Sequence, residues 1–187
     1  MRRVSVVGTT GSGKTTFARD LAQALGVPHV ELDALFWGPR WTPVAREVFR
    51  ARADAATAGD AWIADGNYGG SGVRDIVWGR ADTVVWLDYS LPVLLWRLLR
   101  RTVGRIRSGQ EFWPDTGNRE TVRVAFLSRD SILVWLFRTY WRRKRLMPVA
   151  LARPEFAHLV VHRFRTPRDA ARWLETERLR RFSRIES

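Results

Sequence analysis

Gly8-Thr-Thr-Gly-Ser-Gly-Lys-Thr15 is the stretch that decides the fold of this chain. It fits the pattern G-x-x-x-x-G-K-[ST] without a gap. An apolar run with strand character, residues 3–7, precedes it, and residues 16–25 follow it with apolar side chains at helical spacing. A loop of this composition between a strand and a helix identifies a phosphate-binding P-loop.

Each residue type in this loop has a physical reason. Glycines allow backbone conformations that are closed to other residues, so that successive N–H groups can point into one anion-binding concavity. The following helix adds the positive end of its dipole. We expect Lys14 to reach the β- and γ-phosphates of a nucleoside triphosphate and the Thr15 hydroxyl to ligate Mg²⁺. The expected nucleotide-binding residues are Gly8, Thr9, Thr10, Gly11, Ser12, Gly13, Lys14, Thr15 and Thr16.

Length and composition restrict the class of protein. A chain of 187 residues with 45% hydrophobic and 27% charged residues is typical of one globular domain, residues 1–187. The absence of cysteine excludes disulfides, thiolate metal sites and a cysteine nucleophile. The first strand begins too early for a signal peptide, and the most apolar run, residues 91–99, is too short to span a bilayer. We therefore expect a cytoplasmic protein without membrane contact.

The net charge of +13 comes almost wholly from arginine, since Lys14 and Lys144 are the only lysines among 32 basic residues. Arginine binds phosphate bidentately and keeps its charge when partly buried. This suits a nucleotide site closed by arginines, and it suits a nucleic acid or another acidic surface equally well. A biased genome composition is a third explanation. The three histidines, in contrast, lack metal-ligand spacing, which favours structural roles.

Two predicted strands end in a carboxylate. Residues 29–33 end at Asp33, and the strand over residues 62–65 ends in Asp65-Gly66. Ligands of parallel α/β sheets bind at the carboxyl ends of the strands. We expect Asp33 to face the acceptor of a transferred group or to order the water shell of a metal. Asp65 has the Walker B arrangement and is expected to hold Mg²⁺ together with Thr15.

Further candidate substrate-binding residues follow these strands. Trp37 belongs to an aromatic stretch, residues 34–41, which either forms an apolar wall for the acceptor or covers the sheet edge. Asn67 and Tyr68 follow Asp65 and should lie in the cleft. The loop 69–72 lacks a lysine, and no helix is predicted to start there, so we interpret it as a hinge or substrate loop. Arg74, just beyond it, is a candidate contact for an acceptor anion.

The second half of the chain contains two basic helical segments. The first segment follows the strand 83–88 and Ser90, which has the residue type of an N-cap, and Arg97 and Arg101 lie on one stripe of it. A second helical pattern runs from about residue 120 to residue 145. We expect these segments, about residues 97–150, to form an arginine-rich helical lid that excludes water and stabilises charge on transferred phosphate.

The remaining elements are predicted from local signals. Thr42 and Pro43 have the residue types of an N-cap and first helical position, predicting a helix to about residue 57. Residues 146–156 contain two prolines and indicate a connection, residues 158–164 a strand, and residues 166–174 a last helix. The polar tail, residues 178–184, is expected to fray.

Several segments together resemble the adenylate-kinase-related P-loop proteins of the DNA topology modulation protein FlaR family. The similar segments are residues 8–16, Glu31-Leu-Asp-Ala-Leu-Phe-Trp37, Trp62 with Asp65-Gly-Asn-Tyr68, and Arg80-Ala-Asp82 with Trp86-Leu-Asp88 and the arginines that follow. The resemblance extends from Arg3 to about Leu174. It implies an α/β, three-layer P-loop NTPase fold with a five-stranded parallel sheet of order 2-3-1-4-5, as in nucleoside monophosphate and shikimate kinases.

The resemblance also implies roles. In such kinases the third-strand Asp-Gly and the lid arginines serve the metal and the phosphates, which implies these roles for Asp65, Arg97 and Arg101. Two motifs depart from the pattern. Glu31-Leu-Asp33 matches the shikimate-kinase Asp-x-Asp only in part, and the adenylate-kinase Asp-Gly-Phe-Pro-Arg is replaced by residues 65–69, Asp-Gly-Asn-Tyr-Gly. The elements that read AMP are therefore missing.

Two functions follow as expectations. The first is an ATP- and Mg²⁺-dependent phosphotransferase acting on a small-molecule acceptor, with Lys14, Asp33, Arg97 and Arg101 as catalytic residues. The second is an ATP-binding regulatory protein that contacts DNA through the basic lid without reading its sequence. No motif names the acceptor, separates ATP from GTP or sets the oligomeric state.

Overall fold

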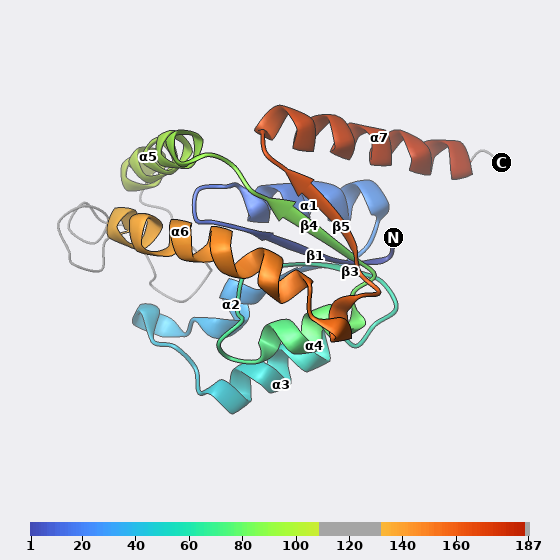
Figure 1. The fold of residues 1–187 in the computed structure, drawn as a ribbon, viewed down its shortest axis with the longest axis horizontal. Helices are drawn as coiled ribbons and strands as arrows, with labels where there is room; N and C mark the ends of the chain where they lie inside the picture. The colour runs from blue at the N-terminus through green and yellow to red at the C-terminus, as the bar shows by residue number, and fades with distance from the viewer. Residues whose placement is uncertain (109–131, 186–187) are drawn as a thin grey trace.

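The central sheet has the predicted strand order. A computed structural model of the chain describes residues 1–108 and 132–185. Five strands form one sheet of order β2-β3-β1-β4-β5, and every neighbouring pair is parallel (Figure 1). The strands are β1 (Arg3–Gly8), β2 (His29–Glu31), β3 (Trp62–Asp65), β4 (Thr83–Leu87) and β5 (Val160–Phe164). The α/β class and the 2-3-1-4-5 order are thus confirmed.

Helices cover both faces of the sheet. They are α1 (Lys14–Leu25), α2 (Leu32–Phe36), α3 (Arg46–Ala56), α4 (Val73–Arg80), α5 (Leu91–Ser108), α6 (Ile132–Leu151) and α7 (Pro167–Ile185), with short 3₁₀ turns η1 (Pro39–Trp41) and η3 (Pro154–Phe156). In Figure 1, α1 and α7 lie on one side of the sheet and α3 and α4 on the other. The arrangement is the predicted three-layer sandwich.

The hydrophobic core is split by the sheet because successive side chains of a strand point to opposite faces. Val4 and Val6 of β1 pack with α1 and α5, whereas Val7 packs with α3 and α4. Both faces of the inner strands are therefore buried, which explains why β1, β3 and β4 are almost continuously apolar in sequence. Ser5 interrupts this run, and its hydroxyl accepts a hydrogen bond from Trp78 Nε1 at 3.1 Å.

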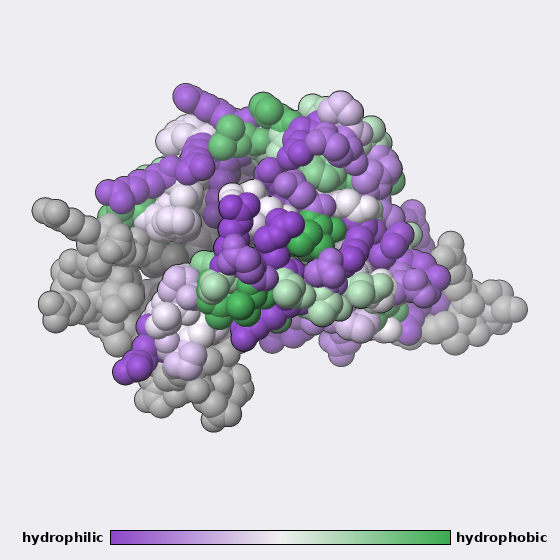
Figure 2. Space-filling model, turned by 90° about the horizontal axis from the view of Figure 1, so that it is seen from below, coloured by the Kyte–Doolittle hydropathy of each residue, from purple (hydrophilic) through white to green (hydrophobic). Residues whose placement is uncertain are grey.

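On the side of α3 and α4, the apolar side chains of these helices face the sheet and the outer surface is largely polar (Figure 2). Seen from below in Figure 2, the surface mixes hydrophilic side chains with smaller apolar areas. Phe49 and Ala53 of α3, and Val77 and Trp78 of α4, are buried against the sheet instead. The described helices include none with the length and apolarity required to cross a bilayer.

The structure corrects two predictions near the second strand. β2 ends at Glu31, opposite Asp65, where β3 also ends, so Asp33 lies in the first turn of α2 instead of in a strand. Thr42 and Pro43 do not start a helix, because this segment pairs back on α2 through a bridge from Pro43 to Trp37. α3 begins only at Arg46. Tertiary pairing therefore overrides the local helix-start signal.

A helix was missed after the glycine-rich loop. α4 begins at Val73 with Gly72 as its N-cap, at a φ of 77° that favours glycine. The usual side-chain cap is replaced by the neighbouring Ser71, whose hydroxyl accepts a hydrogen bond from the Val73 N–H at 3.4 Å. The expectation that no helix starts there was wrong. The N-cap residue is a glycine without a capping side chain, and the side chain that accepts the hydrogen bond belongs to the residue before it.

The last two helices end later in the chain than predicted. α6 continues through Pro148 to Leu151, because Met147 and Ala150 are buried in the core and outweigh the single hydrogen bond that proline removes. Its predicted start near residue 120 lies outside the described residues. α7 reaches Ile185 instead of fraying. Arg181 secures it by donating to the Ala24 carbonyl at the C-terminal end of α1, at 2.9 Å. The last strand is shorter than predicted and begins at Val160.

The loop before β4 offers a test of how the first strand is anchored. The Asp82 carboxylate accepts hydrogen bonds from the N–H groups of Arg2 (2.7 Å) and Arg3 (3.0 Å) and from the Thr83 hydroxyl (2.6 Å). Partial burial disfavours the charged carboxylate, but these hydrogen bonds outweigh it and hold the pKa of Asp82 below its ordinary value. The ionised form is therefore the stabilising one.

We predict that Asp82→Asn lowers the free energy of unfolding by about 1–2 kcal/mol near neutral pH. A carboxyl whose pKa is lowered by folding stabilises above its unfolded pKa, and this contribution is lost as the pH falls through the folded pKa. Urea unfolding at about pH 7 and about pH 3 should therefore show a difference between wild type and variant that narrows in acid. An equal difference at both pH values would contradict this account.

Candidate functional site

The P-loop lies between β1 and α1 at the carboxyl edge of the sheet. Gly11 and Gly13 have φ values of 81° and 80°, where side chains are strained. A Cβ atom would also lie 2.6 Å from the Leu94 carbonyl oxygen at Gly11, and 2.6 Å from an Arg97 guanidinium nitrogen at Gly13. Glycine is thus favoured at both positions by conformation, and at Gly11 also by space, because the Leu94 carbonyl belongs to the backbone whereas the Arg97 guanidinium is the end of a flexible side chain.

The loop fits the phosphates of a nucleotide. Gly13 is the N-cap of α1, and the first turn of α1 contains Lys14 and no acidic residue. The helix N-terminus and the lysine therefore favour a bound anion. The Ser12 hydroxyl is buried and has no hydrogen-bond partner among the residues that the structure describes. A buried oxygen of this kind requires a partner, which a phosphate oxygen would provide.

The two predicted metal-binding residues are in contact. The Thr15 hydroxyl donates to Asp65 Oδ2 at 2.7 Å, and the Asp65 side chain has no exposed surface. In the described part of the chain, no group of three or more His, Cys, Asp and Glu side chains could hold a metal ion. This hydroxyl–carboxylate pair instead fits the habit of Mg²⁺, which uses one or two protein oxygens together with substrate phosphates and water.

Asp65 has a second partner that the sequence analysis assigned no such role. His29 Nε2 lies 2.9 Å from Asp65 Oδ1, so that each carboxylate oxygen contacts one side chain. The two residues are far apart in sequence, and β2 pairs with β3 so that His29 is opposite Ile63. Only the register of this pairing brings the imidazole to Asp65.

Asn67 forms two hydrogen bonds with the first residue of the P-loop. Its Oδ1 accepts from the Gly8 N–H at 3.1 Å, and its Nδ2 donates to the Gly8 carbonyl at 2.6 Å. The preceding Gly66 has a φ of 151°, and a Cβ atom there would lie 2.9 Å from the Leu32 side chain. The turn 65–68 therefore aims Asp65 and Asn67 at two points of the same loop.

Tyr68, the last residue of this turn, contacts the acceptor-side carboxylate. Its hydroxyl donates to Asp33 Oδ1 at 2.6 Å. Burial, followed by the charge and the hydrogen bond of Asp33, raises the pKa of Tyr68, so it stays protonated and donates. Its ring lies 5.0 Å from Phe36 and 4.6 Å from Phe49, centroid to centroid. Trp37 contacts Phe36 edge-on at 4.8 Å and is half-buried, so this aromatic cluster adjoins Asp33.

Arginines of α5 and α6 lie beside the P-loop. The contact at Gly13 places the Arg97 guanidinium against the loop, and Arg101, one turn further along α5, is half-buried. Arg143 of α6 donates to the Gly8 carbonyl at 3.2 Å. Burial lowers the pKa of Arg143, and the charge of Asp33 opposes this shift. The sequence analysis included Arg143 in the arginine-rich lid but did not single it out, because only the packing of α6 decides which arginine faces inward.

The residue after Arg143 forms an ion pair that links α6 to the sheet. Lys144 Nζ lies 3.9 Å from Asp88 Oδ1, and the Arg163 guanidinium of β5 lies 2.6 Å from Asp88 Oδ2. Asp88 follows β4 and is buried. Since Leu87 pairs with Gly8, this ion pair lies close to the start of the P-loop.

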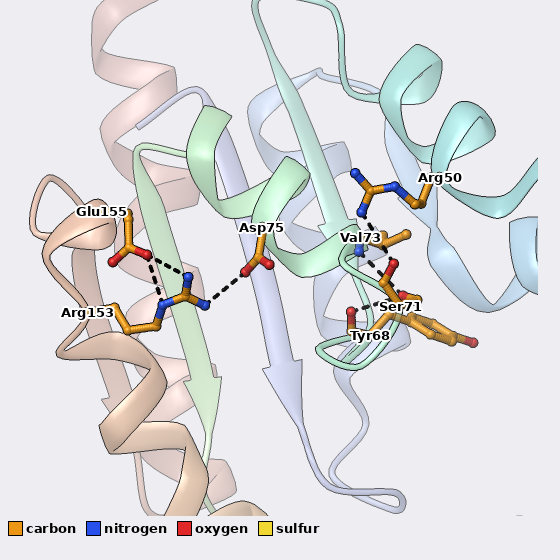
Figure 3. A network of polar contacts seen from close by, with 7 residues as sticks. All are labelled: Arg50, Tyr68, Ser71, Val73, Asp75, Arg153 and Glu155. Carbon is orange, nitrogen blue, oxygen red and sulfur yellow. Dashed lines mark hydrogen bonds and ion pairs between the residues drawn. The ribbon is translucent and has the colours of Figure 1, made fainter. Parts of the chain in front are cut away.

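The loop 69–72 has a separate network (Figure 3). The Arg50 guanidinium donates to the Ser71 carbonyl at 3.4 Å, and the Ser71 hydroxyl donates to the Tyr68 carbonyl at 3.2 Å. Arg46, which Figure 3 does not draw, donates to the same Ser71 carbonyl at 3.1 Å. The predicted anion contact, Arg74, lies 5.2 Å above the Trp78 ring and against Gly69, where burial lowers its pKa. The contacts described for Arg74 are therefore with this loop and α4, not with Asp33.

A second network in Figure 3 links the segment after α6 to α4. Arg153 forms ion pairs with Asp75 of α4 at 3.2 Å and with Glu155 of η3 at 2.6 Å. All three side chains are exposed, so each pair contributes little by itself.

Comparisons with known proteins support the fold. No family model and no curated protein sequence matches the chain. Solved structures do match it along its length. A gluconokinase from Sinorhizobium meliloti 1021 is 20% identical, with a TM-score of 0.53 over 99% of this chain and 95% of that one. A shikimate kinase from Acinetobacter baumannii in complex with shikimate is 20% identical, with a TM-score of 0.55 over 99% and 94%.

A shikimate kinase from Bacteroides thetaiotaomicron is 18% identical, with a TM-score of 0.52 over 100% of this chain and 99% of that one. Identities this low show a shared fold. The predicted P-loop kinase fold is therefore confirmed, whereas the narrower resemblance to the FlaR family stays a prediction.

The contact of Asn67 with Gly8 leads to a stability prediction. Asn67→Ala leaves the buried Gly8 N–H without its partner, so we expect the free energy of unfolding to fall by about 1–3 kcal/mol. The control is Gln23→Ala, which removes an exposed amide from α1 and should change stability by no more than about 0.5 kcal/mol. Urea denaturation measures both, and equal stability of the two variants would show that the Asn67 hydrogen bonds contribute nothing.

Proposed function

We propose that this chain is a Mg²⁺-dependent phosphotransferase that moves the γ-phosphoryl group of ATP to a small acceptor with a hydroxyl group. The observation that supports it most is the turn 65–68, which contacts the P-loop helix through Asp65, the P-loop start through Asn67 and the acceptor-side carboxylate through Tyr68. A protein that only bound a nucleotide would have no use for the last contact. The fold shared with kinases supports the proposal.

Different residues of the site bind the phosphates, hold the cation and stabilise the charge that develops during transfer. When bound, ATP with Mg²⁺ would supply the phosphoryl group and a divalent charge. The N–H groups of the P-loop and the Lys14 ammonium orient the phosphates, while Thr15 and Asp65 hold the cation. Arg97, Arg101 and Arg143 supply positive charge where negative charge develops during transfer.

The acceptor site is built around Asp33. Its carboxylate accepts the proton of the acceptor hydroxyl, and Tyr68 fixes its orientation by donating to Oδ1. Trp37, with Phe36 of the same aromatic cluster, provides an apolar surface for the carbon skeleton of the acceptor. In this proposal Asn67 positions the P-loop instead of touching the acceptor, and Arg74 contributes to the loop 69–72.

α5 and α6 complete the proposed single kinase domain as a lid. They connect β4 to β5 in the chain and bring Arg97 and Arg143 to the P-loop. Closure of α5 and α6 over bound nucleotide would exclude water, which strengthens every electrostatic interaction in the site. The part of the predicted lid between these helices lies outside the described residues.

Lys14→Ala and Asp65→Asn are predicted to lower turnover by at least about 100-fold, because each removes a charge from the transferring phosphate or its cation. The assay is acceptor-stimulated ADP release in a screen of nucleosides, nucleotides and small hydroxyl compounds. Arg19→Ala, which removes an exposed cation from the same helix, α1, is the matched control and should retain turnover. Full turnover in Lys14→Ala would remove the proposed function.

A second candidate function is DNA association by an ATP-binding regulatory protein. The observation that favours it is the sequence of α5 and α6, which contains ten basic and no acidic residues. Arg138, Arg142 and Arg145 of α6 are exposed. Phosphate-driven binding would use these arginines without reading sequence.

This alternative predicts a gel shift of duplex DNA that weakens by orders of magnitude between about 50 and about 200 mM salt. Changing Arg138, Arg142 and Arg145 together to glutamine should reduce the shift, while Arg172→Gln, an exposed site on α7, should not. The absence of any shift at the lower salt concentration would exclude the candidate.

A further inference from the structure

His29 contacts the carboxylate that is proposed to hold the cation. Asp65 is fully buried, its Oδ2 accepts from Thr15 at 2.7 Å, and its Oδ1 lies 2.9 Å from His29 Nε2. The His29 side chain is 20% exposed. Each carboxylate oxygen can accept more than one hydrogen bond, so both contacts leave acceptor capacity at the edge that faces the P-loop.

The strand register explains why the imidazole reaches this point. Glu31 is opposite Asp65, and His29 is opposite Ile63, two residues earlier on β3. Residues separated by two on a strand share a face, so Ile63 and Asp65 both point toward α1. His29 points to the same face as its partner in register. It therefore reaches Asp65 from β2, on the same face of the sheet that α1 covers, and contacts the carboxylate oxygen that Thr15 does not.

Two donors on different oxygens fix the plane of the carboxylate. With Thr15 alone, the carboxylate would be free to turn about its Cβ–Cγ bond, and the buried Oδ1 would lack a partner. In many proteins, residues that hydrogen-bond to a metal-binding side chain orient it in the same manner, and the loss of such a residue lowers metal affinity by about 10–100-fold.

We propose that His29 is a positioning residue that orients Asp65 for a divalent metal held with the nucleotide. This inference rests on the proposed function, which supplies the metal. The interpretation that His29 only joins β2 to β3 makes a different prediction. A purely structural residue would affect nucleotide binding with and without metal equally, whereas an orienting residue affects the metal-dependent part alone.

The variants separate these interpretations. His29→Leu removes the donor and keeps an apolar side chain of similar volume. His29→Gln places an amide N–H four bonds from Cα, as in Nε2 of histidine, and should rescue the contact. His29→Asn ends one bond short and should not rescue it, and it serves as a second loss variant if His29→Leu does not fold. His158→Leu is the control, because His158 Nε2 contacts the Trp78 carbonyl at 3.2 Å, away from the P-loop.

The measurement is Mn²⁺ affinity of the complex with a non-hydrolysable ATP analogue, read from the electron paramagnetic resonance signal of free Mn²⁺. Calorimetry with the same analogue in a chelator gives the metal-free nucleotide affinity. We expect His29→Leu and His29→Asn to weaken Mn²⁺ binding by about 10–100-fold with metal-free affinity unchanged, and His29→Gln and His158→Leu to match wild type.

Wild-type Mn²⁺ affinity in both loss variants, an equal loss in the metal-free measurement, or failure of His29→Gln to restore binding would overturn the inference. Wild-type protein that binds Mn²⁺ with the analogue but phosphorylates no acceptor would overturn only the proposed phosphotransferase function. Wild-type protein whose complex takes up no Mn²⁺ would overturn both.

Discussion

The hydrogen bond from the Thr15 hydroxyl to the buried Asp65 carboxylate is the constraint around which the site is arranged. It joins the first turn of α1 to the end of β3, and it requires that β1 and β3 be neighbours in parallel register. A buried carboxylate is costly unless its oxygens are satisfied, so the contact also fixes where β3 ends. The following turn then delivers Asn67 to Gly8 and Tyr68 to Asp33 from that fixed point.

The charges of the chain are divided between two surfaces of the same helices. On α6, Arg143 and Lys144 face inward, toward Gly8 and Asp88, whereas Arg142 and Arg145 are exposed. The inward pair is compensated by a carbonyl and a carboxylate. The exposed group has no acidic residue on its own helix, so its repulsion is relieved chiefly by solvent and salt. The high net charge therefore does not measure the charge at the site.

Much of this arrangement was predictable from the sequence. The P-loop, the Asp-Gly at the end of the third strand and the pairing of Thr15 with Asp65 follow from a gap-free motif and the rule that parallel strands present their carboxyl ends on one edge. The aromatic stretch was left between two interpretations. Phe36 packs against the core, which fits the covering role, while Trp37 is half-buried beside Asp33, and its role as a wall for the acceptor stays a prediction.

The helix boundaries and site residues that the sequence analysis missed depend on contacts between segments that are distant in the chain. Thr42 and Pro43 carry helix-start signals, yet their pairing with Trp37 prevails. α4 was missed because a left-handed glycine replaces a side-chain cap, and α6 passes through Pro148 because its far end is buried in the core. His29 and Arg143 reach the site only through strand register and helix rotation. Neither the strand register nor the helix rotation is encoded within a short window of sequence.

The hydrogen bonds from Arg181 to the last carbonyls of α1 also join segments that are distant in the chain. A guanidinium at the negative end of that helix is favoured by the same dipole that would favour a phosphate at its positive end, about 18 Å away, so both ends of α1 have a partner of the complementary sign in the proposed complex.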